Sequence, residues 1–172
     1  LSILSMVCIV LDGAHFRGGI ISWRPLNNTV QGTTAQIQIH QRYFWNRQWG
    51  SFSLPYCTEA NVAAQTVIVI GSTMTCLANC SSSTYAALST NMITTDCDSN
   101  PIIESWAGEH YDIETLPLTT SITIGFPSSA WFAALYIGSG GNWAICNRLN
   151  LAPRPDGYIN SSPVTTTLPV VF

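Results

Sequence analysis

The chain has 172 residues, of which 47% are hydrophobic and only 9% are charged, well below the roughly 25% of an ordinary soluble domain. This length suits one domain with a hydrophobic core. The formal net charge is -3 and all basic residues are arginine, so the chain lacks the basic surface that nucleic acids and anionic membranes attract. We therefore expect no nucleic-acid partner.

The N-terminal segment, residues 1–14, begins with an apolar run over residues 1–11. One interpretation is a remnant of a secretory signal, although no positive region precedes it and Asp12 stands where a cleavage after Ala14 needs a small neutral residue. The run is too short to cross a bilayer, so no membrane span is predicted. The other interpretation is a β-strand, because alternate positions put apolar side chains on both faces. The sequence leaves both interpretations open.

Residues 15–172 are predicted to form a single all-β domain, an antiparallel β-sandwich of immunoglobulin-like or jelly-roll-like type. Ala35, Ile37 and Ile39 alternate with polar neighbours, which is typical of a strand with one buried face. β-branched residues dominate the regular segments, and no helical spacing is found. Strands separated by turn sequences are predicted over residues 19–24, 33–45, 66–70, 121–126, 131–137, 143–151 and 164–172.

Residues 71–118 differ from the rest because they hold three of the six cysteines, most of the acidic residues and several Ser/Thr runs. We predict an irregular insertion here, held by disulfides and displayed at the surface.

The acidic residues of this segment could bind calcium, but we favour a solvated loop and predict no metal. The sequence from Asp96 to Asn100 resembles the start of an EF-hand loop, yet Pro101 replaces the required glycine and Ala107 stands where glutamate is needed. The acidic residues are Asp96, Asp98, Glu104, Glu109, Asp112 and Glu114.

The cysteines are even in number and irregularly spaced. A zinc site needs repeated close pairs of Cys or His, and only Cys76 and Cys80 approach that spacing. Disulfides are therefore favoured, and they indicate an extracellular or cell-surface location. The spacing does not give the pairing. The predicted disulfide cysteines are Cys8, Cys57, Cys76, Cys80, Cys97 and Cys146.

Three sequons predict N-glycosylation, at Asn27, Asn79 and Asn160. Asn79 is followed by a cysteine in the middle position of its sequon, so we expect it to be used less. Covalent glycans would solubilise a surface that has few charges. No cofactor is predicted.

No catalytic motif is found in the sequence. His15, His40 and His110 are far apart and match no recognised catalytic spacing, and there is neither a nucleophile elbow nor a phosphate-binding glycine loop. We predict that the protein is not an enzyme. Most aromatic residues are expected in the core, whereas Trp49 and Trp106 lie outside the predicted strands and are the candidates for stacking on a sugar.

Two end motifs carry a family resemblance. His15-Phe16-Arg17-Gly18-Gly19 with Ile21-Ser22-Trp23-Arg24-Pro25, and Arg154-Pro155-Asp156-Gly157-Tyr158-Ile159-Asn160-Ser161-Ser162-Pro163, resemble an N-terminal extracellular domain of large invertebrate cell-surface proteins. Tyr43-Phe44-Trp45 and the cysteines at 76, 80, 97 and 146 are similar too. The resemblance spans roughly residues 15–172 and implies a secreted or displayed module without catalytic activity.

The sequence predicts one of two functions. In the first, which we favour, the chain is a structural subunit of an extracellular filament or matrix. Residues 1–11 would complete the sheet of the next subunit head to tail, and Cys8 would lock the junction. Residues 164–172 offer a second such strand, limited by Pro169. In the second, the chain is an adhesion or recognition module that binds a protein or glycan through residues 71–118.

Overall fold

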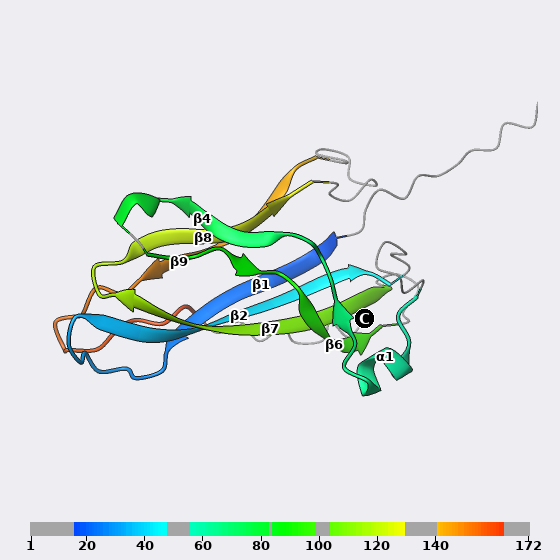
Figure 1. The fold of residues 1–172 in the computed structure, drawn as a ribbon, viewed down its shortest axis with the longest axis horizontal. Helices are drawn as coiled ribbons and strands as arrows, with labels where there is room; N and C mark the ends of the chain where they lie inside the picture. Colours follow the sequence, from blue (N-terminus) through cyan, green and yellow to red (C-terminus); the bar gives the residue numbers. More distant parts are fainter. Residues whose placement is uncertain (1–15, 48–55, 83, 99–103, 130–140, 164–172) are drawn as a thin grey trace, which may run out of the picture.

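The computed structural model of the chain describes residues 16–47, 56–82, 84–98, 104–129 and 141–163 (Figure 1). The segments predicted as strands at 1–11, 131–137 and 164–172 lie outside these ranges, as do Cys8 and Trp49.

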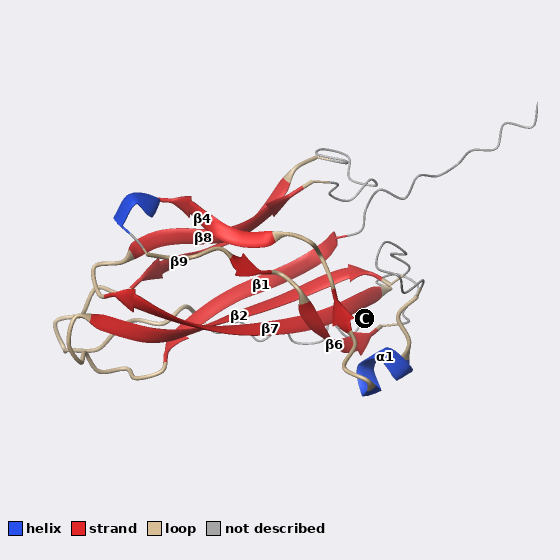
Figure 2. Cartoon of the chain, in the orientation of Figure 1, coloured by secondary structure: helices blue, strands red, loops and turns tan. Residues whose placement is uncertain are grey.

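Two antiparallel sheets pack face to face, which confirms the predicted all-β sandwich (Figure 2). The five-stranded sheet has the order β1 (Phe16–Pro25), β2 (Thr34–Asn46), β7 (Ser105–Pro117), β6 (Met92–Cys97) and β3 (Val67–Ile68). The four-stranded sheet has the order β5 (Leu88–Ser89), β4 (Thr73–Ala78), β8 (Ser121–Ser128) and β9 (Trp143–Asn150). In the described part of the chain, no helix is both long and apolar enough to cross a membrane.

Strand β2 lies between β1 and β7 in the larger sheet. Its odd-numbered residues from Ala35 to Trp45 are all buried, and its even-numbered residues are partly or fully exposed, as the alternation predicted. The strand pairs with β1 on one side and along its whole length with β7 on the other. This long pairing fixes which side chains of β1, β2 and β7 face solvent.

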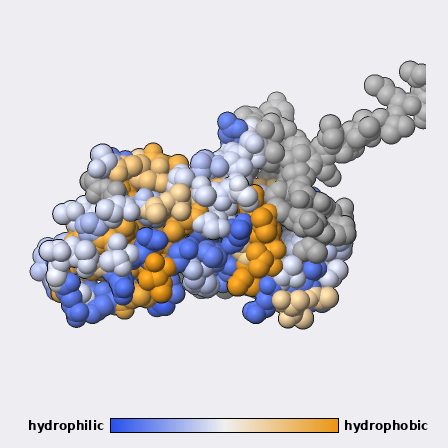
Figure 3. Space-filling view, viewed as in Figure 1, coloured by the Kyte–Doolittle hydropathy of each residue, from blue (hydrophilic) through white to orange (hydrophobic). Residues whose placement is uncertain are grey.

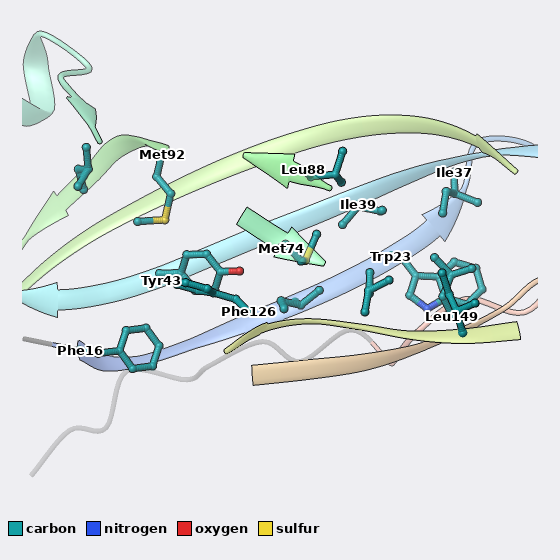
Figure 4. Close-up of a cluster of buried hydrophobic side chains, with 14 of the residues drawn as sticks. Phe16, Trp23, Ile37, Ile39, Tyr43, Met74, Leu88, Met92, Phe126 and Leu149 are labelled. Carbon is teal, nitrogen blue, oxygen red and sulfur yellow. The ribbon is translucent and has the colours of Figure 1, made fainter. Parts of the chain in front are cut away.

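The core lies between the two sheets (Figure 4). Ile37, Ile39 and Tyr43 from β2 meet Phe126 of β8 and Leu149 of β9, and all five are fully buried. Apolar area removed from water supplies most of the stabilisation of such a core, at about 25 cal/mol per Å².

The predicted irregular insertion over residues 71–118 is wrong for most of its length, because strands β4, β5, β6 and β7 lie within it. Strand β7 is even one of the two longest strands. Its pattern was obscured because polar residues occupy inward as well as outward positions: His110 and Asp112 lie opposite Gln41 and Ile39, on the face that packs on the other sheet. Acidic residues along a strand were thus mistaken for a loop.

One short helix was not predicted. Helix α1 (Glu59–Ala63) is a single turn after Cys57, in which the Thr58 N–H donates a 2.8 Å hydrogen bond to Asn61 Oδ1. A second short turn, the 3-10 helix η2 (Cys80–Ser82), follows β4. Both turns are too short to give a periodic signal in the sequence.

The sandwich has two unlike ends. At the aromatic end, defined by Phe16, Trp45, Phe126 and Trp143, the rings of Phe16 and Trp143 stack with centroids 3.7 Å apart, and Phe126 lies 5.1 Å from Trp143. At the opposite end, the turn end, the β1–β2 and β7–β8 loops meet through the Leu118 N–H, which donates to Thr33 O at 2.9 Å. Helix α1 lies at the right and η2 at the left in Figure 1.

Candidate functional site

Two disulfides close the described cysteines into loops. Cys57 pairs with Cys97 beside α1, and Cys76 pairs with Cys80 around η2. Cys146 is exposed on β9 and has no disulfide partner among the described residues. Four of the six predicted disulfide cysteines are thereby paired, and Cys8 and Cys146 remain.

The three sequons all lie toward the turn end. Ile159, the neighbour of Asn160, donates its N–H to Asn28 O at 2.9 Å, so the sequons of Asn27 and Asn160 are adjacent. Asn79 follows Ala78, which pairs with Thr123 near the start of β8. The Asn side chains at 27, 79 and 160 are exposed. Glycans placed there would leave the aromatic end uncovered.

The sequons differ in their local geometry. Asn27 Oδ1 accepts hydrogen bonds from the N–H and the hydroxyl of Thr29, at 3.0 and 2.8 Å. The hydroxyl of Ser162, which belongs to the Asn160 sequon, is buried against Trp23. Asn79 has a positive φ of 59° and sits inside the Cys76–Cys80 loop. The first sequon thus keeps its amide and hydroxyl together at the surface.

Strands β1 and β9 form one flank of the sandwich, where the edges of the two sheets lie side by side. Asn147 Nδ2 donates to Ile21 O at 2.7 Å, and Trp23 Nε1 donates to Arg148 O at 2.9 Å. Among the described residues, the edges of the opposite flank are the two-residue strands β3 and β5. Short edges resist the addition of another strand, whereas long ones invite it.

The last described segment covers part of the β1 edge. The Trp23 N–H donates to Ser162 Oγ at 2.7 Å, and the Ser162 N–H and hydroxyl both donate to Trp23 O at 3.0 Å. Since outward main-chain groups alternate along an antiparallel edge, the N–H groups of Gly19 and Ile21 also point to this flank. No described residue accepts a hydrogen bond from either. On β9, Cys146 has the same outward parity as Arg148.

The outer face of the five-stranded sheet carries a row of polar and aromatic side chains. Ser22 of β1, His40 of β2 and Tyr111 of β7 are cross-strand neighbours. The rings of His40 and Tyr111 stack with centroids 4.3 Å apart and an interplanar angle of 4°. Tyr111 is 53% exposed, so this ring pair is presented to solvent.

Glu109 holds this row in place. Its carboxylate accepts a 2.9 Å hydrogen bond from the Tyr111 hydroxyl and lies 3.5 Å from Arg42 Nε. His40 Nε2 lies 3.3 Å away, within ion-pair distance but outside hydrogen-bond geometry. Partial burial, followed by the bond to Glu109, raises the pKa of Tyr111 above its ordinary value. The tyrosine therefore stays a neutral donor at physiological pH.

The next row is formed by Arg24, Gln38 and Ile113. Arg24 Nε donates to Gln38 Oε1 at 3.0 Å. Among the described residues, no carboxylate lies within ion-pair distance of Arg24, in contrast to Arg42. Arg24 is thus an exposed guanidinium that is oriented by a neutral partner.

The residues of these two rows, apart from Ile113, line a groove of about 340 Å³ that reaches from Tyr111 to Ser162. Exposed apolar residues continue the same face, since Val67 and Ile93 are cross-strand neighbours beside Glu109 and Ile113 is 60% exposed. Figure 3 shows hydrophobic patches interleaved with hydrophilic ones over the described surface. Neighbouring exposed apolar side chains of this kind are a common feature of interaction surfaces.

A polar network occupies the inner face of β2 and β7. The fully buried Gln41 donates to Asp112 Oδ2 and to Ser89 O, both at 3.0 Å, and accepts from the Tyr43 hydroxyl at 3.1 Å. Asp112 also contacts His110 Nε2 at 3.0 Å. Burial raises the pKa of Tyr43 far above its usual range. Asp112 Oδ2 joins β7 to β2 through Gln41, and Asp112 Oδ1 is held by His110 of its own strand, so the network is structural.

Burial also raises the pKa of two further groups of this region, Tyr85 and Glu114. It raises the pKa of Tyr85 strongly, with smaller contributions from Glu114 and Asp112. It raises the pKa of Glu114 too, and the charge of Asp112 adds to the effect.

The acidic residues considered as an alternative calcium site are not brought together. Glu109 points outward from β7, whereas Asp112 and Glu114 point inward, and Asp96 lies at the end of β6. The described residues contain no group of three or more His, Cys, Asp or Glu side chains placed to hold a metal.

The predicted sugar-stacking role of Trp106 is wrong. Trp106 is only 1% exposed, and its Nε1 donates to Thr94 Oγ1 at 3.0 Å. It was assigned to a loop, but it lies on β7 opposite Trp45 with its ring in the core. Tyr111 is the exposed aromatic residue of the same strand, and the alternation of β7 was the signal that could have found it.

No protein-family model, curated protein or solved structure matches this chain.

Proposed function

We propose that this chain is a non-enzymatic structural glycoprotein of an extracellular filament or matrix, assembled by strand exchange. The supporting observation is the flank formed by β1 and β9, where two long edges lie together and the outward N–H groups of Gly19 and Ile21 have no described partner. An added strand gains main-chain hydrogen bonds on such an edge. Residues 1–11 of a neighbouring copy are the proposed strand.

The cysteines support the same assignment. Cys146 is exposed on the β9 edge, and Cys8 lies within residues 1–11. With the other four cysteines paired, a Cys8–Cys146 bond between neighbours would lock each junction covalently. The donor segment and the acceptor edge are different surfaces, so the contact is heterologous and repeats from copy to copy.

The distribution of sequons fits this arrangement. Glycans at Asn27, Asn79 and Asn160 would cover the turn end, while the chain enters the sandwich at Phe16, at the aromatic end. Bulky sugars would thus solubilise one end and leave the junction clear. Disulfides and sequons together support secretion or cell-surface display.

The experiment is expression of the full chain in glycosylating eukaryotic cells, followed by non-reducing electrophoresis, electron microscopy and peptide mapping. The expected result is a ladder of oligomers linked by Cys8–Cys146, with chains that carry two different epitope tags cross-linked to each other when co-expressed. Deleting residues 1–11 in a Cys146→Ser background should give a monomer with an unchanged far-UV spectrum. The Ser5→Ala variant is the matched control and should polymerise.

Two results would overturn strand exchange. One is polymer of unchanged length after the deletion. The other is a Cys8–Cys146 bond found solely within single chains, which would make residues 1–11 part of their own domain.

A second candidate function is recognition by an adhesion module of a larger surface protein. The observation that favours it is the outer face of the five-stranded sheet, where Tyr111 and Ile113 are 53% and 60% exposed beside the groove. Glycan and protein arrays test it: the Tyr111→Ala and Ile113→Ala variants should lose binding that a Tyr158→Ala control at the turn end retains. Equal binding by all three would exclude this face.

A further inference from the structure

The groove beside Arg24 has the composition of a small-molecule site that recognises both the charge and the shape of its ligand. It is lined by Ser22 and Arg24 of β1, Gln38 and His40 of β2 and Tyr111 of β7. Small-ligand sites combine an apolar or aromatic surface with a few placed polar groups. This groove offers a stacked ring pair, one guanidinium, one amide and one hydroxyl.

The charge balance of the groove favours an anion. Glu109 already contacts Arg42, His40 and Tyr111, so its negative charge is matched within the protein. Among the described residues, no carboxylate lies within ion-pair distance of Arg24 to balance its positive charge. Its Nε is held by Gln38, which leaves both terminal nitrogens to donate in parallel to one carboxylate.

The hydrogen-bonding groups around Arg24 favour a polyhydroxylated ligand. Ser22 is cross-strand to His40, and Gln38 is cross-strand to Arg24. No described residue accepts a hydrogen bond from the Gln38 side-chain nitrogen. The Ser162 hydroxyl, by contrast, is already hydrogen-bonded to the main chain of Trp23. Ser22 and Gln38 thus remain to bind hydroxyls, while the aromatic pair can pack against the C–H face of a sugar ring.

We propose that this groove binds a carboxylate-bearing sugar, such as a uronic or sialic acid residue of a glycan. Arg24 receives the carboxylate, Ser22 and Gln38 bind ring hydroxyls, and the His40–Tyr111 pair supports the ring. The site rests on the recognition function of the outer face and does not depend on strand exchange.

The test is a nuclear magnetic resonance titration of the labelled full chain with methyl glucuronide, compared with methyl glucoside and with acetate. Methyl glucoside has the ring without the carboxylate, and acetate has the carboxylate without the ring. We expect shifts at the amides of Ser22, Gln38 and Tyr111, with methyl glucuronide binding at least about tenfold more tightly than either comparison. N-Acetylneuraminic acid, a second acidic sugar, should shift the same amides.

Variants distinguish the groove from general attraction to arginine. Arg24→Gln should weaken methyl glucuronide binding about tenfold, to the level of methyl glucoside. Arg148→Gln is the matched control, because Arg148 is also exposed and its Nη2 donates to a serine hydroxyl, Ser121 Oγ, at 2.8 Å. That variant should bind like the unmodified chain. Unchanged amide spectra elsewhere would show that both variants fold.

Three results would overturn the proposal: equal binding of glucuronide and glucoside, equal binding of glucuronide and acetate, or no shifts at these amides. Array binding through Tyr111 that survives any of them would keep the recognition function and reject only the acidic sugar. Absence of both array binding and shifts would reject the recognition function as well.

Discussion

The two ends of the sandwich are built in different ways. The aromatic end is held by ring packing among Phe16, Trp45, Phe126 and Trp143, with Phe16 and Trp143 stacked 3.7 Å apart. The turn end is held by main-chain hydrogen bonds between loops, such as those joining Thr33 to Leu118 and Asn28 to Ile159. Packing is dense and intolerant of lost volume, whereas polar loops accept attached glycans. The aromatic end therefore provides stability, whereas the turn end provides surface positions that can carry glycans.

The largest expected effect is at the aromatic end. Phe126 is fully buried and lies between both sheets, so Phe126→Ala should lower the free energy of unfolding by about 4 kcal/mol through lost burial and a cavity. Tyr158→Ala at the turn end removes a side chain that is 47% exposed and should change it by less than about 0.5 kcal/mol. Urea unfolding of both variants measures this; equal losses would refute the contrast between the ends.

The disulfides give the next effect. The Cys57–Cys97 bond joins residues that are 40 positions apart in the sequence, and the Cys76–Cys80 bond joins residues 4 positions apart. Loop entropy in the unfolded chain predicts that replacing the first pair by alanine costs about 4 kcal/mol and the second about 2 kcal/mol. Denaturant midpoints of the two double variants provide the measurement. A greater loss for the short loop would show that Cys76–Cys80 acts through native contacts instead.

A smaller effect is expected at the link between β1 and Ser162. Ser162→Ala removes the acceptor of the buried Trp23 N–H and should destabilise the fold by about 2 kcal/mol. It also removes the sequon, so Asn160→Gln, which keeps the hydroxyl, is the control and should be nearly neutral. Thermal unfolding of enzymatically deglycosylated protein separates the two. Matching shifts for both variants would show that the loss of the Ser162 hydroxyl is not the cause.

The smallest effect concerns the fraction of each sequon that carries a glycan, not the stability of the fold. Asn27 keeps its amide and the Thr29 hydroxyl together at the surface, whereas Asn79 is followed by a disulfide cysteine. Glycopeptide mass spectrometry should therefore find Asn27 occupied most and Asn79 least. Cys76→Ala with Cys80→Ala keeps the Asn79 sequon and opens the loop, which should raise occupancy at Asn79. Occupancy that stays the same would remove the disulfide as the cause.

Sequence patterns predicted the sandwich because most of its strands follow the period of two. Strand β2 is the clearest case, with Ile37 and Ile39 buried where alternation placed them. The pattern failed where a polar side chain is buried with partners. Gln41 lies on the inward face because Tyr43, Asp112 and Ser89 O satisfy its amide, and no single-strand pattern reveals partners 48 and 71 residues away.

The candidate surface was harder to predict for the same reason. The alternation along β2 predicts that His40 lies on the exposed face, but Tyr111 lies in a strand where the sequence predicts an irregular segment. The groove exists only because three strands align Ser22, His40 and Tyr111 in one row. Such a row depends on sheet register, which arises from pairing between distant segments.

The bond between Trp23 and Ser162 has a consequence for synthesis, because it joins positions 139 residues apart. At about 5–20 residues per second, the ribosome needs roughly 7–28 s to make the chain between them. Over that interval β1 is already translated while the segment that covers its edge is not. The outer edge of β1 would thus stay open in the nascent chain after β1 pairs with β2. Folding is completed by a late, non-local contact, which makes it slow. A glycan added early at Asn27, beside β1, would cover this edge until Ser162 has been translated.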